Sequence, residues 1–284
     1  MEEVLICGEE KSVGIPKEII QAGGYKVPDC YLKAKQLVEI GKALREKNNT
    51  KCITLPLCQT VEVEFLGGQV NYANDELGPR VSNRIFSSLE ELPIDKSVNF
   101  SIGLCEEVRL AAEELKQNQE DVILNVSGPM TVLSGLVEMQ KIFVQRRKNP
   151  QIYEKAIQWI VENLFSYIEL MKGKISLVSL ADPAAGLDLM GAKVAKELAE
   201  LAYIPLLKRI QTLGVSVHLC PRMTAVLLLS EHVHKKEQEI SISGTYEEVV
   251  LDLARNKGKI IAHGCLKQKQ TQYLEGKLQV LELD

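Results

Sequence analysis

Short apolar runs alternate with longer amphipathic segments along most of the chain. The short runs are rich in valine, isoleucine and leucine, as buried strands are, and the longer segments repeat apolar residues at helical spacing. Strands that alternate with helices in this way form a parallel sheet, either as a closed barrel or as an open doubly wound sheet. We expect strands at 3–7, 51–57, 97–102, 121–128, 175–182, 215–220, 239–243 and 259–265.

The amphipathic segments predict helices between most of these strands. Pro205 is expected to kink the helix at 191–213, because proline cannot continue an unbroken helix. Two stretches have weak periodicity: 59–68 is predicted to be irregular, and 71–96 to be a long connection of the kind that barrels place over their active face. Helices are expected at 15–24, 29–47, 106–118, 129–144, 150–172, 191–213, 222–232 and 246–256.

Polar and reactive side chains stand where several of the predicted strands end. They are Cys58, Ser127, Asp182, Cys220 and Cys265. In a (β/α)8 barrel the carboxyl ends of all strands share one catalytic face, whereas an open sheet would bring fewer of them into one crevice. The pattern therefore favours an α/β protein built as a (β/α)8 TIM-type barrel. No linker splits the chain, so residues 1–284 are predicted to form a single domain.

Two of the predicted strands end in the same motif, His-x-Cys. The motifs are His218-Leu-Cys220 and His263-Gly-Cys265. Residues two positions apart in a strand point to the same face, so each histidine projects together with its cysteine. If the two strands lie near each other, their ends bring imidazole and thiolate groups to one point, and a tetrahedral zinc site is built in this way.

The composition is that of an ordinary soluble enzyme. Apolar residues make up 45% and charged residues 25% of the 284 residues, and the formal net charge is −4. The chain shows neither the basic stripe of a nucleic-acid-binding protein nor the apolar run of about 18 residues that a membrane span needs. Its acidic N-terminus lacks the layout of a signal peptide. We expect a cytoplasmic protein without a nucleic-acid or membrane partner.

The seven cysteines are scattered widely and do not form a disulfide framework. In a reducing compartment such cysteines are free thiols, some of them buried and inert and others available as metal ligands. We interpret four of them as structural and leave Cys58 undecided. The four are Cys7, Cys30, Cys52 and Cys105.

Several motifs resemble the uroporphyrinogen decarboxylase-like superfamily, and within it the zinc-dependent corrinoid methyltransferases. The motifs are Ala181-Asp-Pro-Ala-Ala-Gly-Leu-Asp-Leu-Met190, then His218-Leu-Cys220, then Gly264-Cys265. Pro56-Leu-Cys-Gln-Thr-Val-Glu-Val-Glu-Phe-Leu-Gly-Gly68 is similar to the Thr-Val-Glu-Ala-Glu segment of that branch, and Gly128-Pro-Met-Thr131 to its Gly-Pro-hydrophobic-Thr turn. The resemblance covers roughly residues 20–270.

The resemblance implies a (β/α)8 barrel that binds zinc through a His-x-Cys pair and one distant cysteine. Carried over to this sequence, the metal ligands are His218, Cys220 and Cys265. Members of the branch transfer a methyl group from a methylated corrinoid protein to a thiol, commonly coenzyme M. The expected activity is therefore that of a methyltransferase, with zinc as cofactor, a methylcorrinoid (cobalamin) as methyl donor, and a corrinoid protein and a small methyl acceptor as partners.

The chemistry of such a site rests on a thiolate. A free thiol has a pKa of about 8.5 and is mostly protonated at neutral pH, whereas coordination to zinc deprotonates it. Three protein ligands leave one zinc position for the substrate. Asp182 and Glu62 are the predicted catalytic residues, Asp182 for substrate contact or for holding the site in shape, Glu62 for approaching the metal or orienting the substrate. Whether Glu62, Glu64 or His263 completes the zinc shell stays open, and Asp182 could instead cap the segment that follows it.

The sequence departs from the family pattern in two places. Decarboxylases carry an N-terminal arginine-bearing segment for the substrate carboxylates, which is not recognisable here, and this favours the methyltransferase branch. Cys220 and Cys265 also lie closer together than is usual, and Pro221-Arg222 stands where the family commonly has glycine and a small polar residue. The barrel is accordingly expected to be reduced at the N-terminus and near its seventh βα unit, with the effect on activity left open.

Two other functions compete with this one. A decarboxylase acting on a tetrapyrrole would need no metal and would need a basic pocket, for which no residues are obvious in the sequence. A non-catalytic corrinoid- or metal-binding member of the family would fit the unrecognisable N-terminal segment and the shortened interval between Cys220 and Cys265. The methyl acceptor also stays open among coenzyme M, homocysteine, another thiol and a pterin, and the sequence does not indicate the oligomeric state.

Overall fold

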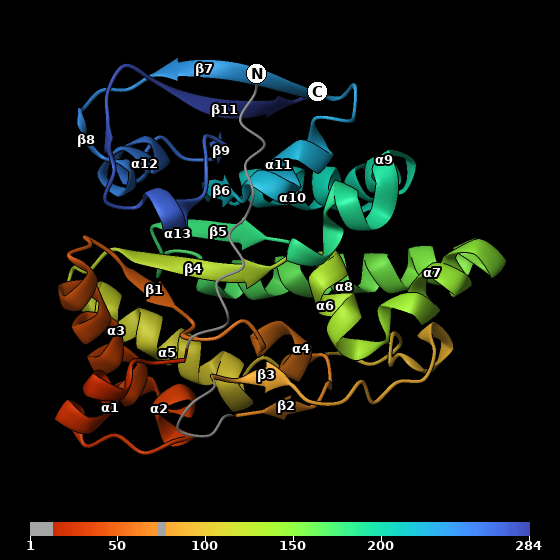
Figure 1. Ribbon diagram of the computed structural model, residues 1–284, viewed down its shortest axis with the longest axis horizontal. Helices are drawn as coiled ribbons and strands as arrows, with labels where there is room; N and C mark the ends of the chain where they lie inside the picture. The colour runs from red at the N-terminus through yellow and green to blue at the C-terminus, as the bar shows by residue number, and fades with distance from the viewer. Residues whose placement is uncertain (1–13, 73–77) are drawn as a thin grey trace.

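The computed structural model describes residues 14–72 and 78–284, so the strand predicted at 3–7, with Cys7, lies outside the described residues. A row of parallel strands forms the centre of the molecule (Figure 1). In spatial order they are β1 (Ile53–Leu55), β4 (Val122–Ser127), β5 (Leu177–Ala181), β6 (Val217–Leu219) and β9 (Ile260–Ile261).

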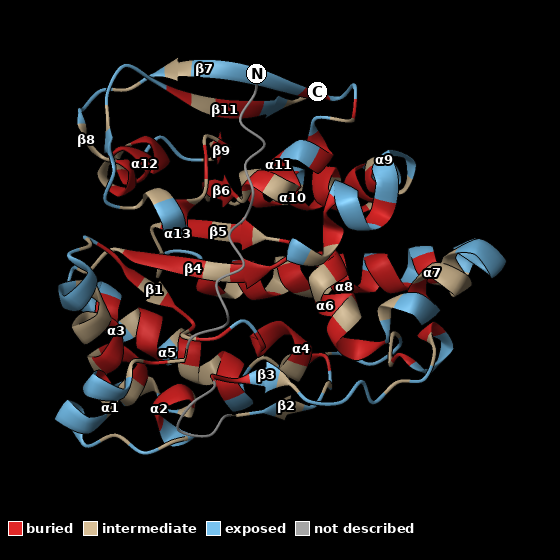
Figure 2. Cartoon of the chain, in the orientation of Figure 1, coloured by how far each residue is buried: buried red, intermediate tan, exposed pale blue. Residues whose placement is uncertain are grey.

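An antiparallel ribbon continues the sheet beyond β9. It consists of β11 (Lys277–Leu283) and β7 (Val233–Glu239), neither of which the sequence predicted. Figure 2 shows most of β7 exposed, while β4 and β5 are largely buried. The strand expected at 239–243 is wrong, because the chain turns away directly after β7. Among the described residues, the strand pairs run from β1 to β7 and do not join into a ring.

The two faces of the parallel strands bury different side chains, because successive residues of a strand point to opposite sides. On β4, Val122, Leu124 and Val126 belong to the larger hydrophobic cluster, which includes the surrounding helices. Ile123 belongs to a second cluster, together with its neighbour Leu177 on β5. We call the side of Ile123 and Leu177 the inner face of the sheet and the opposite side the outer face.

Long helices cover the outer face. They are α3 (Ala34–Asn48), α5 (Gly103–Gln117), α8 (Pro150–Met171) and α10 (Ile204–Thr212), and all contribute to the larger cluster. The helix predicted at 150–172 is confirmed as α8, which begins with a proline, where the missing N–H costs no helical hydrogen bond.

The remaining helices and strands connect these layers. They are α1 (Lys17–Gly23), α2 (Asp29–Leu32), α4 (Val61–Phe65), β2 (Val70–Asn71), β3 (Arg80–Val81), α6 (Pro129–Leu136), α7 (Met139–Lys148), α9 (Leu187–Leu198), α11 (Pro221–Leu227), β8 (Gly244–Thr245), α12 (Tyr246–Ala254), α13 (Leu266–Lys269) and β10 (Tyr273–Leu274).

Two helices predicted as continuous are each divided in two. The helix at 29–47 is broken at Lys33, and the helix at 129–144 at Val137, since both residues have extended backbone angles. The helix at 191–213 contains a π-helical turn, Ala199–Tyr203, just before Pro205. The expected interruption at this proline therefore takes the form of a local widening of the helix, which leaves the proline ring room.

Two further predictions in the first half of the chain are wrong. The stretch at 59–68 is not irregular throughout, because it contains α4. The strand at 97–102 does not form: these residues lead into α5, and the side chain of Ile102 is 63% exposed. Its apolar alternation resembles a half-buried strand, but no neighbouring strand lies beside it in the described residues.

Helix α12, predicted at 246–256 and confirmed, lies on the inner face. Its Val250 and Leu253 are in the same cluster as Ile123 and Leu177 of the sheet, and as Leu278 of β11. Figure 1 shows α12 between the ribbon of β7 and β11 and the parallel strands. The helix therefore fills part of the space that the inner face encloses.

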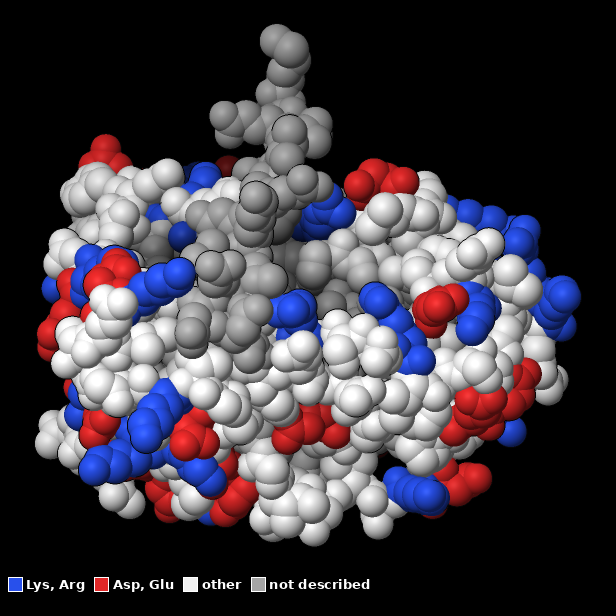
Figure 3. Space-filling view, turned by 60° about the horizontal axis from the view of Figure 1, so that its bottom comes forward, with Lys and Arg blue, Asp and Glu red and all other residues white. Residues whose placement is uncertain are grey.

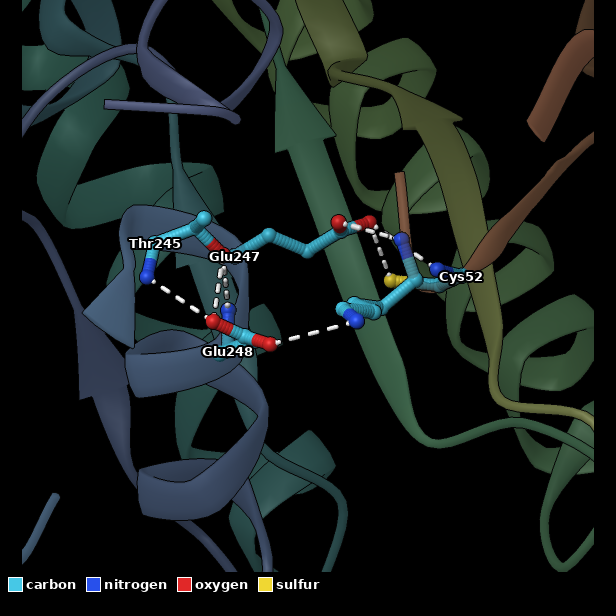
Figure 4. Close-up of polar contacts among 5 residues, drawn as sticks. Cys52, Thr245, Glu247 and Glu248 are labelled. Carbon is cyan, nitrogen blue, oxygen red and sulfur yellow. Dashed lines mark hydrogen bonds and ion pairs between the residues drawn. The ribbon is translucent and has the colours of Figure 1, made fainter. Parts of the chain in front are cut away.

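A single carboxyl group fastens α12 to the beginning of β1. Glu247, which is 1% exposed, accepts hydrogen bonds from the backbone N–H groups of Lys51 (2.7 Å) and Cys52 (3.1 Å), and from the Cys52 thiol (2.6 Å). Figure 4 shows these contacts beside the capping box in which Thr245 and Glu248 satisfy each other's backbone N–H groups. Glu247 thus supplies the acceptors that a neighbouring strand would otherwise offer.

The surface carries charges of both signs. On the face drawn in Figure 3, lysine and arginine lie beside aspartate and glutamate. Arg109, for example, pairs with Glu106 (2.6 Å) and Glu113 (2.7 Å) along α5. Ion pairs near the surface contribute little stability, about 1 kcal/mol or less each. In the described residues, no helix is long and apolar enough to cross a membrane.

Replacing Glu247 with alanine should lower the free energy of unfolding by about 3 kcal/mol, because buried N–H groups lose their acceptor. Urea unfolding of wild type, Glu247→Ala and Glu248→Ala measures this. The neighbouring Glu248 is the control: its replacement removes the capping box and an ion pair with Lys51 (3.5 Å), and should cost about 1 kcal/mol. Equal losses in the two variants would contradict the role given to Glu247.

Candidate functional site

The two His-x-Cys segments lie side by side, because β6 and β9 are neighbours in the sheet. His218 of β6 is in register with Ile261 of β9, and His263 and Cys265 follow directly after β9. Cys220 follows β6, and its N–H donates to the Leu180 carbonyl (3.0 Å) of β5. The condition that the two strands lie near each other is therefore fulfilled.

His218 is buried on the inner face, where it contacts α12. Its side chain is 1% exposed, and its Nε2 atom is hydrogen-bonded to the Tyr246 hydroxyl at 2.9 Å. The two rings meet edge to face, with their centroids 5.9 Å apart. Burial, with a smaller effect of His263, lowers the pKa of His218 to about 4. The imidazole is therefore neutral at physiological pH, in the form that binds metals.

Cys220 stands at the junction between β6 and α11. It is the N-cap of that helix, and its Sγ atom accepts a hydrogen bond from the backbone N–H of Met223 (3.4 Å). The side chain is half-buried and is not in a disulfide. The N–H donor favours a negatively charged sulfur at this position.

Cys265 and His263 also lie close to Tyr246. Burial and, after it, the neighbouring Cys265 raise the pKa of the Tyr246 phenol, which places that sulfur near the ring. The His263 ring is 5.8 Å from the Tyr246 ring, and its Nδ1 accepts the backbone N–H of Gln279 (3.2 Å) in β11. Tyr246 thus lies among His218, His263 and Cys265.

The three predicted zinc ligands share an edge of the sheet but do not form a closed metal site. Across 14–72 and 78–284, no three His, Cys, Asp or Glu side chains are arranged to hold an ion. Nε2 of His218 contacts Tyr246 instead. The side chains are nevertheless of the types that bind zinc: His218 offers a neutral imidazole, and Cys220 and Cys265 each offer a thiol.

Asp182 is fully buried and holds the start of α6. Its carboxyl oxygens accept hydrogen bonds from the backbone N–H groups of Met130 (2.9 Å) and Thr131 (2.7 Å), and from the hydroxyls of Thr131 (2.6 Å) and Tyr203 (2.7 Å). Gly128 is needed here, since a Cβ would lie 2.4 Å from the Asp182 side chain. Asp182 therefore caps α6, not the segment that follows it in the sequence.

Glu62 is buried at the carboxyl end of β4. Its Oε1 accepts the backbone N–H of Ser127 (2.9 Å), and its Oε2 has no hydrogen-bond partner in the described part of the chain. Burial raises the pKa of Glu62 to about 7, although the Ser127 contact opposes the shift. The nearby Tyr167 hydroxyl is likewise buried and unpaired in that part. Glu62 is thus close to half protonated at neutral pH.

Glu64, the other acidic residue of α4, points elsewhere. Its Oε1 accepts the backbone N–H of Leu104 (3.0 Å) at the start of α5. Together with Phe65 and Trp159 it lines a cavity of about 330 Å³ between α4, α5 and α8. Glu64 therefore supports a neighbouring helix, and no contact links it to His218.

The remaining described cysteines are buried thiols. Burial raises the pKa of Cys30 and Cys58 to about 11 and that of Cys105 to about 12. Burial, followed by Glu247, raises the pKa of Cys52 as well. These thiols are protonated at neutral pH, as expected for structural cysteines.

Three residues of the site were not among those singled out from the sequence. Asn125 and Ser179 are half-buried and lie in one register row with His218 across β4, β5 and β6. The row could have been derived from strand alternation once the sheet order was known. For Tyr246 the sequence indicated only that it begins a helix, because its contact with His218 depends on how α12 lies on the sheet.

These features define a class of protein: an α/β barrel fold whose histidine and cysteine residues gather where its parallel strands end. The uroporphyrinogen decarboxylase (URO-D) family model matches residues 14–265, and the chain belongs to that family. The predicted superfamily and barrel fold class are thereby confirmed.

The chain is similar to known methyltransferases. It is 21% identical over 252 residues to the methylcobamide:CoM methyltransferase MtaA of Methanosarcina barkeri (strain Fusaro), covering 86% of this chain and 74% of the relative. A second Methanosarcina barkeri MtaA is 21% identical over 221 residues, and the chain spans 63% of its length. The solved structure of a methyltransferase from Methanosarcina mazei has a TM-score of 0.63 and 22% identity, over 81% of this chain and 68% of that one.

Glu62 should make the free energy of unfolding depend on pH. Between about pH 4.5 and about pH 7 the unfolded chain loses this proton while the folded chain keeps it, so stability falls as the pH rises through that window. Glu62→Gln stays neutral and keeps an acceptor for Ser127. Relative to wild type, it should therefore be more stable at pH 8 than at pH 4.5, by a difference on the order of 3 kcal/mol.

Chemical denaturation of both proteins at the two pH values measures this difference. Glu169→Gln, an exposed substitution on α8, is the control and should change stability equally little at both. A stability difference between Glu62→Gln and wild type that does not vary with pH would contradict the buried, protonated state of Glu62.

Proposed function

We propose that this protein is a methyltransferase that moves a methyl group from a methylated corrinoid protein to a small acceptor, a thiol held as a zinc thiolate. The observation that carries the proposal is the adjacency of β6 and β9, which sets His218, Cys220 and Cys265 along one edge of the sheet. The methylcobamide:CoM methyltransferases among the relatives support it.

In this proposal His218, Cys220 and Cys265 are the zinc ligands. His218 offers a neutral imidazole, and the Met223 N–H favours the charged form of the Cys220 sulfur. Bound there, zinc would supply the Lewis acidity that keeps an acceptor thiol deprotonated. The acceptor sulfur would bond to the methyl carbon as the bond between carbon and cobalt breaks, with the electron pair of that bond staying on the corrinoid cobalt of the donor and the thiol proton released to solvent.

The walls of the site come from the inner face. Asn125 and Ser179 are half-buried beside His218 and can donate hydrogen bonds to an acceptor molecule. Asp182 and Glu62 act as positioning residues, because each is buried and bonded to the backbone of a neighbouring loop or helix. Asp182 holds the start of α6, and Glu62 holds the end of β4.

We expect protein purified without chelator or affinity tag to contain about one zinc ion per chain, since three protein ligands form one catalytic site. Cys265→Ala should lose the metal. Elemental analysis of both proteins measures this, and Cys30→Ala, which removes a buried thiol far from β6 in the fold, should keep it. A well-folded wild type without zinc would contradict the thiolate mechanism and would favour tetrapyrrole binding, the alternative that matches the name of the family.

The second part of the proposal concerns activity. Wild type should demethylate free methylcobalamin in the presence of a suitable thiol, and Cys220→Ala should lose at least about a hundredfold in rate, because zinc would lose a ligand. The loss of the methylcobalamin absorption spectrum follows the reaction with coenzyme M, homocysteine and other thiols. If the protein contains zinc but is inactive with every thiol, it is either a non-catalytic metal-binding protein or a methyltransferase with a different acceptor, such as a pterin. An assay with a pterin acceptor distinguishes these two possibilities.

A further inference from the structure

Tyr246 occupies a central position among the proposed ligands. Its hydroxyl is 2.9 Å from Nε2 of His218, its ring centroid is 5.8 Å from that of His263, and Cys265 lies close enough to raise its pKa. The side chain is 1% exposed, so the ring fills this space and water does not. No function of the chain so far requires a tyrosine here.

We propose that Tyr246 competes with the metal for His218, so that zinc binds only when the phenol leaves Nε2. A histidine nitrogen has one lone pair or one proton, and it cannot serve both a tyrosine hydroxyl and a metal ion. The inference rests on the proposed zinc function and adds a residue that sets how tightly the ion is held.

Hydrogen bonds hold the backbone at the start of α12 and leave the Tyr246 side chain as the part that can move. The backbone N–H of Tyr246 donates to the Gln272 carbonyl (2.7 Å), and the next residue, Glu247, is bonded to Lys51 and Cys52. The capping box closes the helix start around Thr245 (Figure 4). Because the backbone is held on both sides, the phenol must leave His218 by rotation of its own side chain, while the helix stays in place.

The contact can be removed without removing the ring. Tyr246→Phe keeps the aromatic body that packs between His218 and His263 and deletes only the hydroxyl. A second buried tyrosine provides a matched control, since Tyr31 of α2 is also buried and its hydroxyl accepts a hydrogen bond from the backbone N–H of Ile15 (2.7 Å). Any general effect of deleting a buried hydroxyl will appear in both variants.

The experiment is a zinc titration of metal-free protein in competition with a chromophoric chelator, on wild type, Tyr246→Phe, Tyr31→Phe and Cys265→Ala. Tyr246→Phe should bind zinc about tenfold more tightly than wild type, because the ion no longer has to displace a hydrogen bond. Tyr31→Phe should stay within about twofold of wild type. Circular dichroism of the metal-free proteins checks that each variant is folded.

A second measurement uses wild type alone and does not depend on the variants folding. With the eight tyrosines labelled at the phenol carbon, the nuclear magnetic resonance signal of Tyr246 should shift when zinc is added, and that of Tyr31 should not. The spectrum of either folded phenylalanine variant assigns one of the two buried signals.

The outcomes separate this inference from the proposed function. Zinc affinity that is unchanged or weaker in Tyr246→Phe, with zinc still lost in Cys265→Ala, overturns the competition alone. Binding of zinc by none of the proteins, Tyr246→Phe included, overturns the competition and the zinc mechanism together. Zinc bound by Tyr246→Phe but not by wild type would support the competition in its strongest form.

Discussion

The carboxyl group of Glu247 holds together parts of the molecule that the strand pairs leave apart. A strand at the end of a sheet has backbone N–H groups that need acceptors when they are buried. Glu247 provides them for Lys51 and Cys52, before β1, from a helix that lies almost two hundred positions later. The same contact fixes the start of α12, and with it the position of Tyr246 beside His218.

The inner face of the sheet is divided along the direction of the strands. Near the strand starts it is apolar, and Ile123 and Leu177 pack against α12. Toward the strand ends it becomes polar, with Asn125, Ser179 and His218 in one row. An apolar base under a polar rim suits a site that must hold a metal and a small substrate away from bulk water.

Most strong patterns in the sequence predicted the right element, and the failures have physical causes. α8 was predicted almost to the residue because a long helix with one apolar stripe has few alternatives. β7 was missed because an edge strand can be polar on both faces and then has no period. α4 was missed because Val61 and Val63 favour strands in isolation, and only the packing of α4 against α5 and α6 makes them helical.

The sequence by itself determined the alternation of strands and helices, the two His-x-Cys motifs and the family. These are local, because each depends on residues a few positions apart. The tertiary structure alone decided that Asp182 caps α6, that Glu64 supports α5 and that Tyr246 covers His218. Those contacts join residues far apart in the chain. A hydrogen bond requires its donor and acceptor atoms to lie about 3 Å apart, and only the packing of helices on the sheet can set such distances.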